Sequence, residues 1–231
     1  MRSFLLALII IVAPAGQANE PIISAFSATY SLHKGGLQVG EADLSMEQHD
    51  GHMRWQLSSR ASGIYALLTE KEPYSESILK KSKSDYQLTS ITVSSNRKDQ
   101  PTETAEFNWS SNRLKVNRKN KSKTLKLKNN VFDYLSIHWL SAQMTIYAGT
   151  KSEITFYRKG KLLKSTLESK GIVEINTKDQ SKSVHLYEQS FKKSKTRYRY
   201  YYDLENPLLP IKIERIKPGK DSNILLFKHL N

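Results

Sequence analysis

Hydrophobic residues recur at every second position over most of this sequence. Phe26, Ala28, Tyr30 and Leu32, for example, alternate with small polar residues. A period of two places the apolar side chains on one face of a β-strand and leaves the other face to solvent. The pattern therefore predicts a mainly β protein with about ten or more short antiparallel strands. Further strands are predicted around Met53 and Leu57, Ala105 and Phe107, Leu114 and Val116, Leu125 and Leu127, Ile154 and Phe156, Val173 and Ile175, Val184 and Leu186, and Ile211 and Ile213.

The phase of this alternation shifts at two places. Apolar positions change from odd to even between Val39 and Ala42, with Gly40 between them, and from even to odd between Leu88 and Ile91. A one-residue shift would turn the apolar side chains outward, so we expect a β-bulge at each place. Bulges bend strands, which favours a curled antiparallel sheet, either an open barrel or a β-spiral. The dipeptide Asp50-Gly51 joins two alternating runs and predicts a tight hairpin turn.

Two segments depart from the strand pattern. Residues Gly63–Glu70 are consistent with a short helical or irregular crossover. Residues Asp133–Ala148 have helical periodicity, with Asp133 as the N-terminal cap and Gly149 as the stop. We expect one largely buried helix packed against or inside the curled sheet. The apolar residues that set its period are Leu135, Trp139, Ala142 and Ile146.

The first residues have the composition of a secretory signal peptide. Arg2 is positive, Phe4–Val12 is an unbroken apolar run, and Ala18 provides a small residue at the expected cleavage site. The alternative is a membrane anchor, but the run is much shorter than the roughly 20 residues that cross a bilayer. We therefore expect a signal peptide over residues 1–18, a single β-rich periplasmic domain over residues 19–231, and no transmembrane segment after signal removal.

Composition excludes several classes of protein. The chain of 231 residues has no cysteine, so it has no disulfides, thiolate metal sites or cysteine nucleophiles. Its hydrophobic share of 38% argues against a disordered chain. The formal net charge of +14 favours association with polyanions. In an exported protein these are lipid headgroups, lipopolysaccharide and cell-wall polymers rather than nucleic acid.

Searches for reactive motifs give no catalytic candidate. Ser77–Lys80 and Ser190–Lys193 match Ser-x-x-Lys, but the companion motifs of that hydrolase class are missing. His49 and His52 flank the Asp50-Gly51 turn and could ligate a metal, although solvated turn residues are the favoured interpretation. His138 is expected to be a core histidine bonded to a carbonyl. We expect no enzyme activity, no catalytic residue, no cofactor and no metal.

The most unusual local feature is a run of bases without an acid over Arg113–Lys128. Leu114, Val116 and Leu125 alternate with the bases, which predicts a hairpin with a cationic outer face. Such a face could bind an anionic surface. Alternatively, the lysines protect an edge strand from pairing with another chain. The candidate surface-binding residues are Arg113, Lys115, Arg118, Lys119, Lys121 and Lys123.

Tyrosines cluster on one predicted strand near the C-terminus. Tyr198, Tyr200 and Tyr202 alternate with Arg199 and Tyr201 and share one face. They could form an aromatic platform for a sugar or nucleic acid. Packing within the sheet is the favoured interpretation.

Several short stretches resemble a family of exported bacterial proteins catalogued as domain of unknown function 3108. The resemblance rests on Ala28–Tyr30 with Lys34–Ala42, on Phe132–Ser136, on Gly171–Thr177 and on Asn206–Glu214. It covers nearly the whole chain after the signal peptide, but not the basic hairpin. It implies a periplasmic, mainly β protein and supplies no activity and no catalytic residues.

Two hypotheses about function follow. The first is a soluble, non-catalytic protein that binds a lipid-like or other amphiphilic envelope molecule within the curled sheet. It rests on the bulges, the apolar helix and the inward positions of Trp55, Trp109 and Trp139. The second is a structural or interaction protein that docks on anionic lipid or polysaccharide through the basic hairpin.

Overall fold

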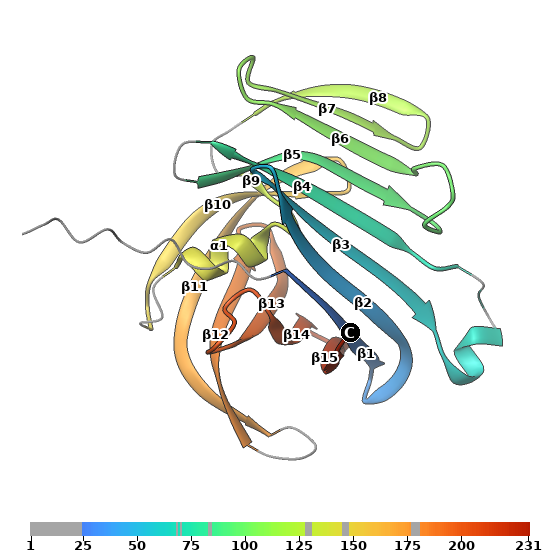
Figure 1. Ribbon diagram of the computed structural model, residues 1–231, viewed down its shortest axis with the longest axis vertical. Helices are drawn as coiled ribbons and strands as arrows, with labels where there is room; N and C mark the ends of the chain where they lie inside the picture. The colour runs from blue at the N-terminus through green and yellow to red at the C-terminus, as the bar shows by residue number, and fades with distance from the viewer. Residues whose placement is uncertain are drawn as a thin grey trace, which may run out of the picture.

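The computed structural model describes residues 25–67, 69, 71–82, 85–127, 131–144, 148–176 and 181–231. The predicted signal peptide, residues 1–18, lies outside these ranges. Within them, fifteen strands form one sheet, which curls around a short helix (Figure 1). The strands are β1 (Phe26–Lys34), β2 (Leu37–His49), β3 (His52–Ala61), β4 (Tyr74–Ser82), β5 (Asp85–Ser94), β6 (Glu103–Asn108), β7 (Arg113–Arg118), β8 (Lys121–Lys126), β9 (Val131–Phe132), β10 (Lys151–Arg158), β11 (Lys161–Asn176), β12 (Ser181–Phe191), β13 (Ser194–Asp203), β14 (Pro210–Lys217) and β15 (Lys220–Leu230). The helices are a 3₁₀ helix, η1 (Gly63–Leu67), and one α-helix, α1 (Ile137–Gln143).

The strand order follows the chain in two halves. In the first half, strands β1 to β8 lie side by side in chain order, and β8 forms one edge of the sheet. In the second half, strands β9 to β15 also lie side by side in chain order, and β9 forms the other edge. The two halves are joined because β1 pairs with β15. The pairs are antiparallel except β9 with β10. Because neighbouring strands run in opposite directions, the turns that join them lie alternately at one end of the sheet and at the other. We call the end with the β1–β2 turn the Gly35 end, and the end with the β2–β3 turn the Gly51 end.

The β2–β3 hairpin has the tight turn expected from its sequence. His49 pairs with His52, and the two residues between them, Asp50 and Gly51, have φ angles of 48° and 71°. Positive φ at both positions matches the right-handed twist of the strands, and Gly and Asp tolerate it.

The first predicted bulge lies in β2. Gly40 pairs with Leu32 while Gln38 pairs with His33, so one residue between Gln38 and Gly40 has no partner. The glycine is needed because a Cβ atom there would come within 2.4 Å of the Arg60 carbonyl oxygen on β3.

The second predicted bulge lies in β5. Ile78 pairs with Ser90 and Leu79 with Leu88, which leaves Thr89 as the extra residue. The Thr89 hydroxyl donates a hydrogen bond to the Ile78 carbonyl, 2.9 Å away. Both bulges therefore lie where the phase shifts of the alternation predicted them.

The curl brings the two edges of the sheet together. The turn between β10 and β11 packs against β6 and β7: the Tyr157 hydroxyl donates to Glu103 at 2.8 Å, and the Gly160 N–H donates to the same carboxylate at 3.2 Å. A Cβ atom on Gly160 would lie 3.4 Å from Val116. The fold is therefore a single open, curled, mainly antiparallel sheet with a packed helix, and the predicted fold class is confirmed.

The helix is shorter than predicted. It covers Ile137–Gln143 rather than residues 133–148, and Met144 is already extended. Residues 133–136 form a turn because the Asp133 carboxylate accepts hydrogen bonds from the N–H groups of Leu135 and Ser136, at 3.3 and 2.8 Å. Asp133 therefore stabilises the turn that enters the helix and is not its N-terminal cap. Residues 145–147 lie outside the described ranges.

Helix α1 fills the interior toward the Gly51 end. The Trp139 indole donates to Asp85 at 2.8 Å and packs edge-on against Tyr86, both at the start of β5. His138 is buried against Trp55 of β3, with ring centroids 5.1 Å apart. The other half of the interior is not filled by the helix.

Candidate functional site

The core is tightly filled at one end of the curled sheet and incompletely filled at the other. On β2 and β3, Met46 and Met53 near the Gly51 end are 0% exposed. Inward residues nearer the Gly35 end, among them Leu32, Leu57 and Leu225, are only partly buried. They border an apolar cavity of about 530 Å³, to which Val39, Leu44, Leu135, Tyr200, Ile213 and Ile224 also contribute.

A second chamber of about 360 Å³ adjoins the first. It is lined by Ile91, Val93 and Tyr157, and it shares four residues with the larger cavity: Leu57, Tyr134, Leu135 and Arg158. The turn of residues 133–136 therefore separates two parts of one interior space.

A buried hydrogen-bond network fixes this turn. Besides the two N–H groups, the Asp133 carboxylate accepts the hydroxyls of Ser77 at 2.5 Å and Ser136 at 2.6 Å. Burial raises the pKa of Asp133 above its usual 3.8, against the opposing effect of these hydrogen bonds. Tyr134 and Leu135 are thus held between the chambers by a satisfied carboxyl group.

Tyr134 stands at the boundary between apolar and cationic surroundings. Its hydroxyl is hydrogen-bonded to that of Tyr198, 3.0 Å away. The Arg158 guanidinium lies over its ring, 5.8 Å from the centroid. Burial raises the pKa of Tyr134, although the charges of Arg158 and Arg215, which line the same cavity, act to lower it.

His138 is buried in the core of the protein. Its Nδ1 is hydrogen-bonded to the Tyr202 hydroxyl, 2.6 Å away, and burial lowers its pKa to about 3. It is a core histidine, as expected, but its partner is a phenol and not a carbonyl. The neutral ring packs between Trp55 and Tyr200.

The concave face changes from apolar to cationic toward the Gly35 end. Leu225 of β15 pairs with Leu32 of β1 and with Ile213 of β14. Leu32, Leu225 and Ile213 thus form a row across three neighbouring strands. Asn223 lies two residues before Leu225 on β15, on the same face, and is the middle residue of the next row toward the Gly35 end. Its direct partners in that row are Lys34 of β1 and Arg215 of β14.

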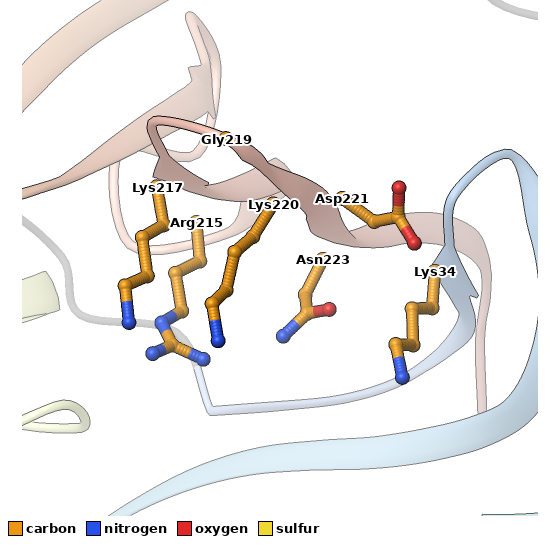
Figure 2. A pocket seen from close by; sticks show the side chains of 7 residues that line it. All are labelled: Lys34, Arg215, Lys217, Gly219, Lys220, Asp221 and Asn223. Atoms are coloured by element: carbon orange, nitrogen blue, oxygen red, sulfur yellow. The ribbon is translucent and has the colours of Figure 1, made fainter.

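This polar row lines a cleft of about 590 Å³ together with Lys217 and Lys220 (Figure 2). Figure 2 shows the nitrogen ends of the Lys34, Arg215 and Lys220 side chains directed to the same side of the β14–β15 hairpin, whereas the Asp221 carboxylate points away from them. The cleft and the apolar cavity share Lys34, Arg215 and Asn223. The cleft is therefore the cationic mouth of the cavity.

Basic residues gather at the Gly35 end from connections far apart in the sequence. The acids in or near the described connections at this end are Glu72, Asp99, Glu103 and Asp221, fewer than the bases there. Among the described residues, bases are concentrated at the connections of the Gly35 end, and this grouping becomes visible only once the strand order is known. The bases in or beside the connections at the Gly35 end are Lys34, Lys71, Arg97, Lys98, Arg118, Lys119, Lys121, Arg158, Lys159, Lys161, Lys192, Lys193, Lys217 and Lys220.

The six predicted surface-binding residues do not form one patch. Arg113 and Lys115 are exposed and alternate with the buried Leu114 and Val116, so they lie on the outer face of β7. Arg113 pairs with Lys126 on that face. This part of the hairpin has the predicted cationic outer face.

Of the other four residues, Arg118, Lys119 and Lys121 belong to the Gly35 end, and Lys123 lies further along β8. Arg118 pairs with Lys121, and Lys123 pairs with Val116, so these bases share the inward-directed face of the hairpin. Arg118 is neutralised by Glu103, with its Nε 2.6 Å from the carboxylate. Lys119 lies in the turn and lines the smaller chamber. Strand β8 is also one edge of the sheet. Its lysines are therefore placed where they would prevent the strand from pairing with another chain, as the alternative interpretation expects.

The remaining residues singled out from the sequence lie either in an exposed turn or in the packed core. His49 and His52 flank the exposed turn, and His49 Nδ1 lies 3.0 Å from Asp50. In the described part of the chain no three His, Asp or Glu side chains converge as metal ligands. Tyr198, Tyr200 and Tyr202, which share one face of β13, are buried, in agreement with the packing interpretation. None of the helices in the described ranges has the length and apolar character required to cross a bilayer.

Fold and cavity together define a mainly β protein with one open, curled sheet, an apolar interior and a cationic mouth. Residues 26–221 match the family model described as "Protein of unknown function (DUF3108)", and the chain belongs to this family. Its fold is similar to the crystal structure of a β-barrel-like protein of domain of unknown function DUF1849 from Brucella abortus. That match has a TM-score of 0.54 and 10% identity and covers 90% of this chain and 98% of the other. No curated protein matches the chain.

Proposed function

We propose that this protein is a non-catalytic periplasmic binder of a lipid-like or other amphiphilic molecule, whose apolar part lies inside the curled sheet. The observation that carries the proposal is the apolar cavity of about 530 Å³ with its adjoining chamber. Cavities of this size are typical of ligand pockets. The half-buried Leu32, Leu57 and Leu225 would lose their remaining contact with water when an alkyl chain enters.

The buried ionisable groups beside the cavity support binding rather than catalysis. The Asp133 carboxylate is held by two hydroxyls and two N–H groups, and His138 is held by Tyr202. The four hydrogen bonds occupy the Asp133 carboxylate, and Tyr202 occupies the Nδ1 of His138. A general acid or base needs a free position toward the substrate.

A series of uncharged detergents tests the proposal. Octyl, decyl and dodecyl maltoside are titrated below their micelle concentrations, and binding is followed by isothermal calorimetry. Each added methylene that enters the cavity should raise the affinity about fourfold. An affinity that does not change with chain length would contradict binding in the cavity.

The periplasmic location rests on residues 1–18. Expression of the full chain in a bacterium, followed by mass measurement of the protein released from the periplasm, should give a mature chain that begins at Asn19. Retention of the complete chain in the cytoplasm would contradict export.

A second candidate function is docking on an anionic lipid or polysaccharide surface. It is favoured by the basic connections at the Gly35 end and by the apolar side chains beside them. Leu37, Ile64 and Leu67 are 63%, 72% and 87% exposed, and Ser62, which directly precedes η1, donates a hydrogen bond from its N–H to the Val39 carbonyl of β2. Exposed apolar residues surrounded by lysines are typical of surfaces that bind membranes.

Two matched variants separate this surface from the outer face of the basic hairpin. Lys192→Gln with Lys193→Gln removes two charges from the Gly35 end, and Arg113→Gln with Lys115→Gln removes two from the outer face of β7. Binding to vesicles with anionic lipid should fall for the first variant only. A fall for the second variant alone would assign docking to the hairpin face, and equal binding by all three proteins would exclude electrostatic docking. Vesicles are replaced by an anionic polysaccharide in a parallel series.

A further inference from the structure

The cationic mouth is built on the same strands as the wall of the cavity. The rows Leu32–Leu225–Ile213 and Lys34–Asn223–Arg215 lie on one face of β1, β15 and β14, two residues apart. Two residues along a strand span about 7 Å. A molecule that fills the cavity and extends toward the mouth therefore passes from apolar side chains to cations within a few bond lengths.

The cations at the mouth lack partners, unlike many others in the fold. Arg60 is paired with Glu41 and Asp43, and Lys228 with Glu41. Across the described ranges, no carboxylate lies within 4.0 Å of Lys34, Arg215, Lys217 or Lys220. Asp221 lies instead against the β1–β2 turn, where a Cβ atom on Gly35 would be 3.2 Å from its carboxyl carbon.

Arg215 has a further unused donor. Its Nε is buried and has no hydrogen-bond partner among the described residues. A buried donor without an acceptor costs free energy, so a shift of the Arg215 side chain that brings this N–H to an external oxygen atom would be favourable. The side-chain amide of Asn223, between Arg215 and Lys34, offers an additional donor.

We propose that Lys34, Asn223 and Arg215, with Lys217 and Lys220 around them, bind the phosphate-type head group of an anionic amphiphile. This inference rests on the proposed function, because it assigns the head group of the molecule whose tail occupies the cavity. The planar guanidinium of Arg215 can donate two parallel hydrogen bonds to a phosphate, and the lysines balance its second charge. The cleft has four cationic side chains and one carboxylate, that of Asp221, which gives a net charge of +3. This charge suits a doubly charged head group better than a single carboxylate.

The test compares ligands that share one tail and differ in the head group. Dodecyl phosphate, dodecyl maltoside and dodecanoate are titrated into the wild-type protein, and inorganic phosphate is titrated as the head group alone. Dodecyl phosphate should bind at least about tenfold more tightly than dodecyl maltoside, the factor expected for one charge-assisted hydrogen-bond pair. Inorganic phosphate should bind far more weakly than either detergent.

Variants assign the preference to the proposed residues. Arg215→Gln with Lys34→Gln should reduce the affinity for dodecyl phosphate to that for dodecyl maltoside and leave the maltoside affinity unchanged. Arg113→Gln with Lys115→Gln removes the same charge from the outer face of β7 and should leave both affinities unchanged. Circular dichroism spectra that match the wild type establish that the mouth variant folds. If the double variant fails to fold, Lys34→Gln with Lys217→Gln, both at exposed positions, takes its place.

The outcomes separate this inference from the function on which it rests. Equal binding of dodecyl phosphate and dodecyl maltoside would overturn the head-group assignment and leave the cavity proposal standing. Binding of neither detergent would overturn both. Binding of inorganic phosphate as tight as that of dodecyl phosphate would show a free-anion site unrelated to the cavity, and tighter binding of dodecanoate would assign a carboxylate in place of the phosphate.

Discussion

Replacement of Asp133 should disrupt the turn that divides the cavity. In Asp133→Ala the hydroxyls of Ser77 and Ser136 and the N–H groups of Leu135 and Ser136 lose their acceptor inside the fold. Removal of one partner from a buried charged network costs about 3–5 kcal/mol. A domain of this kind is stable by about 5–15 kcal/mol, so the change removes a large share of the total.

Smaller changes at the same network provide a graded comparison. Ser77→Ala removes one of the four hydrogen bonds and should cost about 1–2 kcal/mol. Asp133→Asn keeps an acceptor oxygen and the shape of the side chain, so it should cost less than Asp133→Ala. The free energy of unfolding is measured by urea denaturation at neutral pH. Equal stability of Asp133→Ala and Asp133→Asn would refute the assignment of the turn to these hydrogen bonds.

The pH dependence gives a second test of the same residue. Burial raises the pKa of Asp133 above its usual 3.8, so the folded protein holds the proton more tightly than the unfolded chain does. The corresponding stability is present below about pH 4 and is lost as the pH rises through the raised pKa. The stability of the wild type relative to Asp133→Asn should therefore decrease as the pH rises above 4, and a relative stability that increases over this range would contradict the burial argument.

Three further predictions concern the cavity, the closure of the sheet and the core. Leu57→Trp should extend into both chambers and lower the affinity for dodecyl maltoside about tenfold or more, with a stability change below about 1.5 kcal/mol by urea denaturation; an unchanged affinity would place the ligand elsewhere. Glu103→Gln should lower the free energy of unfolding by roughly 1–3 kcal/mol, because Glu103 joins Arg118, Tyr157 and Gly160 across the edges of the sheet, and an unchanged urea midpoint would refute this role. The pKa of His138 falls from 6.5 to about 3 on folding, so the unfolded chain gains a proton first and wild-type stability should fall as the pH decreases from about 6.5 to about 3. His138→Asn should be less stable at neutral pH but flatter over this window, and parallel curves for the two proteins would contradict a buried neutral histidine.

Much of the fold follows from local sequence. The alternation around Ala28 and Tyr30 predicts their burial because only one face of a strand can enter a core. Asp50-Gly51 predicts the hairpin turn because the required positive φ angles exclude most residues. The bulge beside Gly40 is visible as a phase shift because side chains alternate strictly along a strand.

The helix boundary illustrates where local pattern fails. Leu135 fits the helical period and is buried, yet it lies in the turn before α1. Its N–H is bonded to the Asp133 side chain, and that side chain is held in turn by Ser77 of β4, which is distant in sequence. Periodicity reports which residues are buried but not whether a long-range contact interrupts the helix.

The sequence by itself determined that the chain forms curled antiparallel sheet around one buried helical segment, and that it is rich in basic residues. The tertiary structure alone decided which bases act together. Lys34 and Asn223 come from opposite ends of the chain and become neighbours only because β1 pairs with β15, and the lysines of alternate turns meet because antiparallel strands return every second connection to one end. The cavity likewise depends on α1 filling only the Gly51 end. These are consequences of strand order and sheet closure, which arise from contacts between distant residues and leave no local periodicity in the sequence.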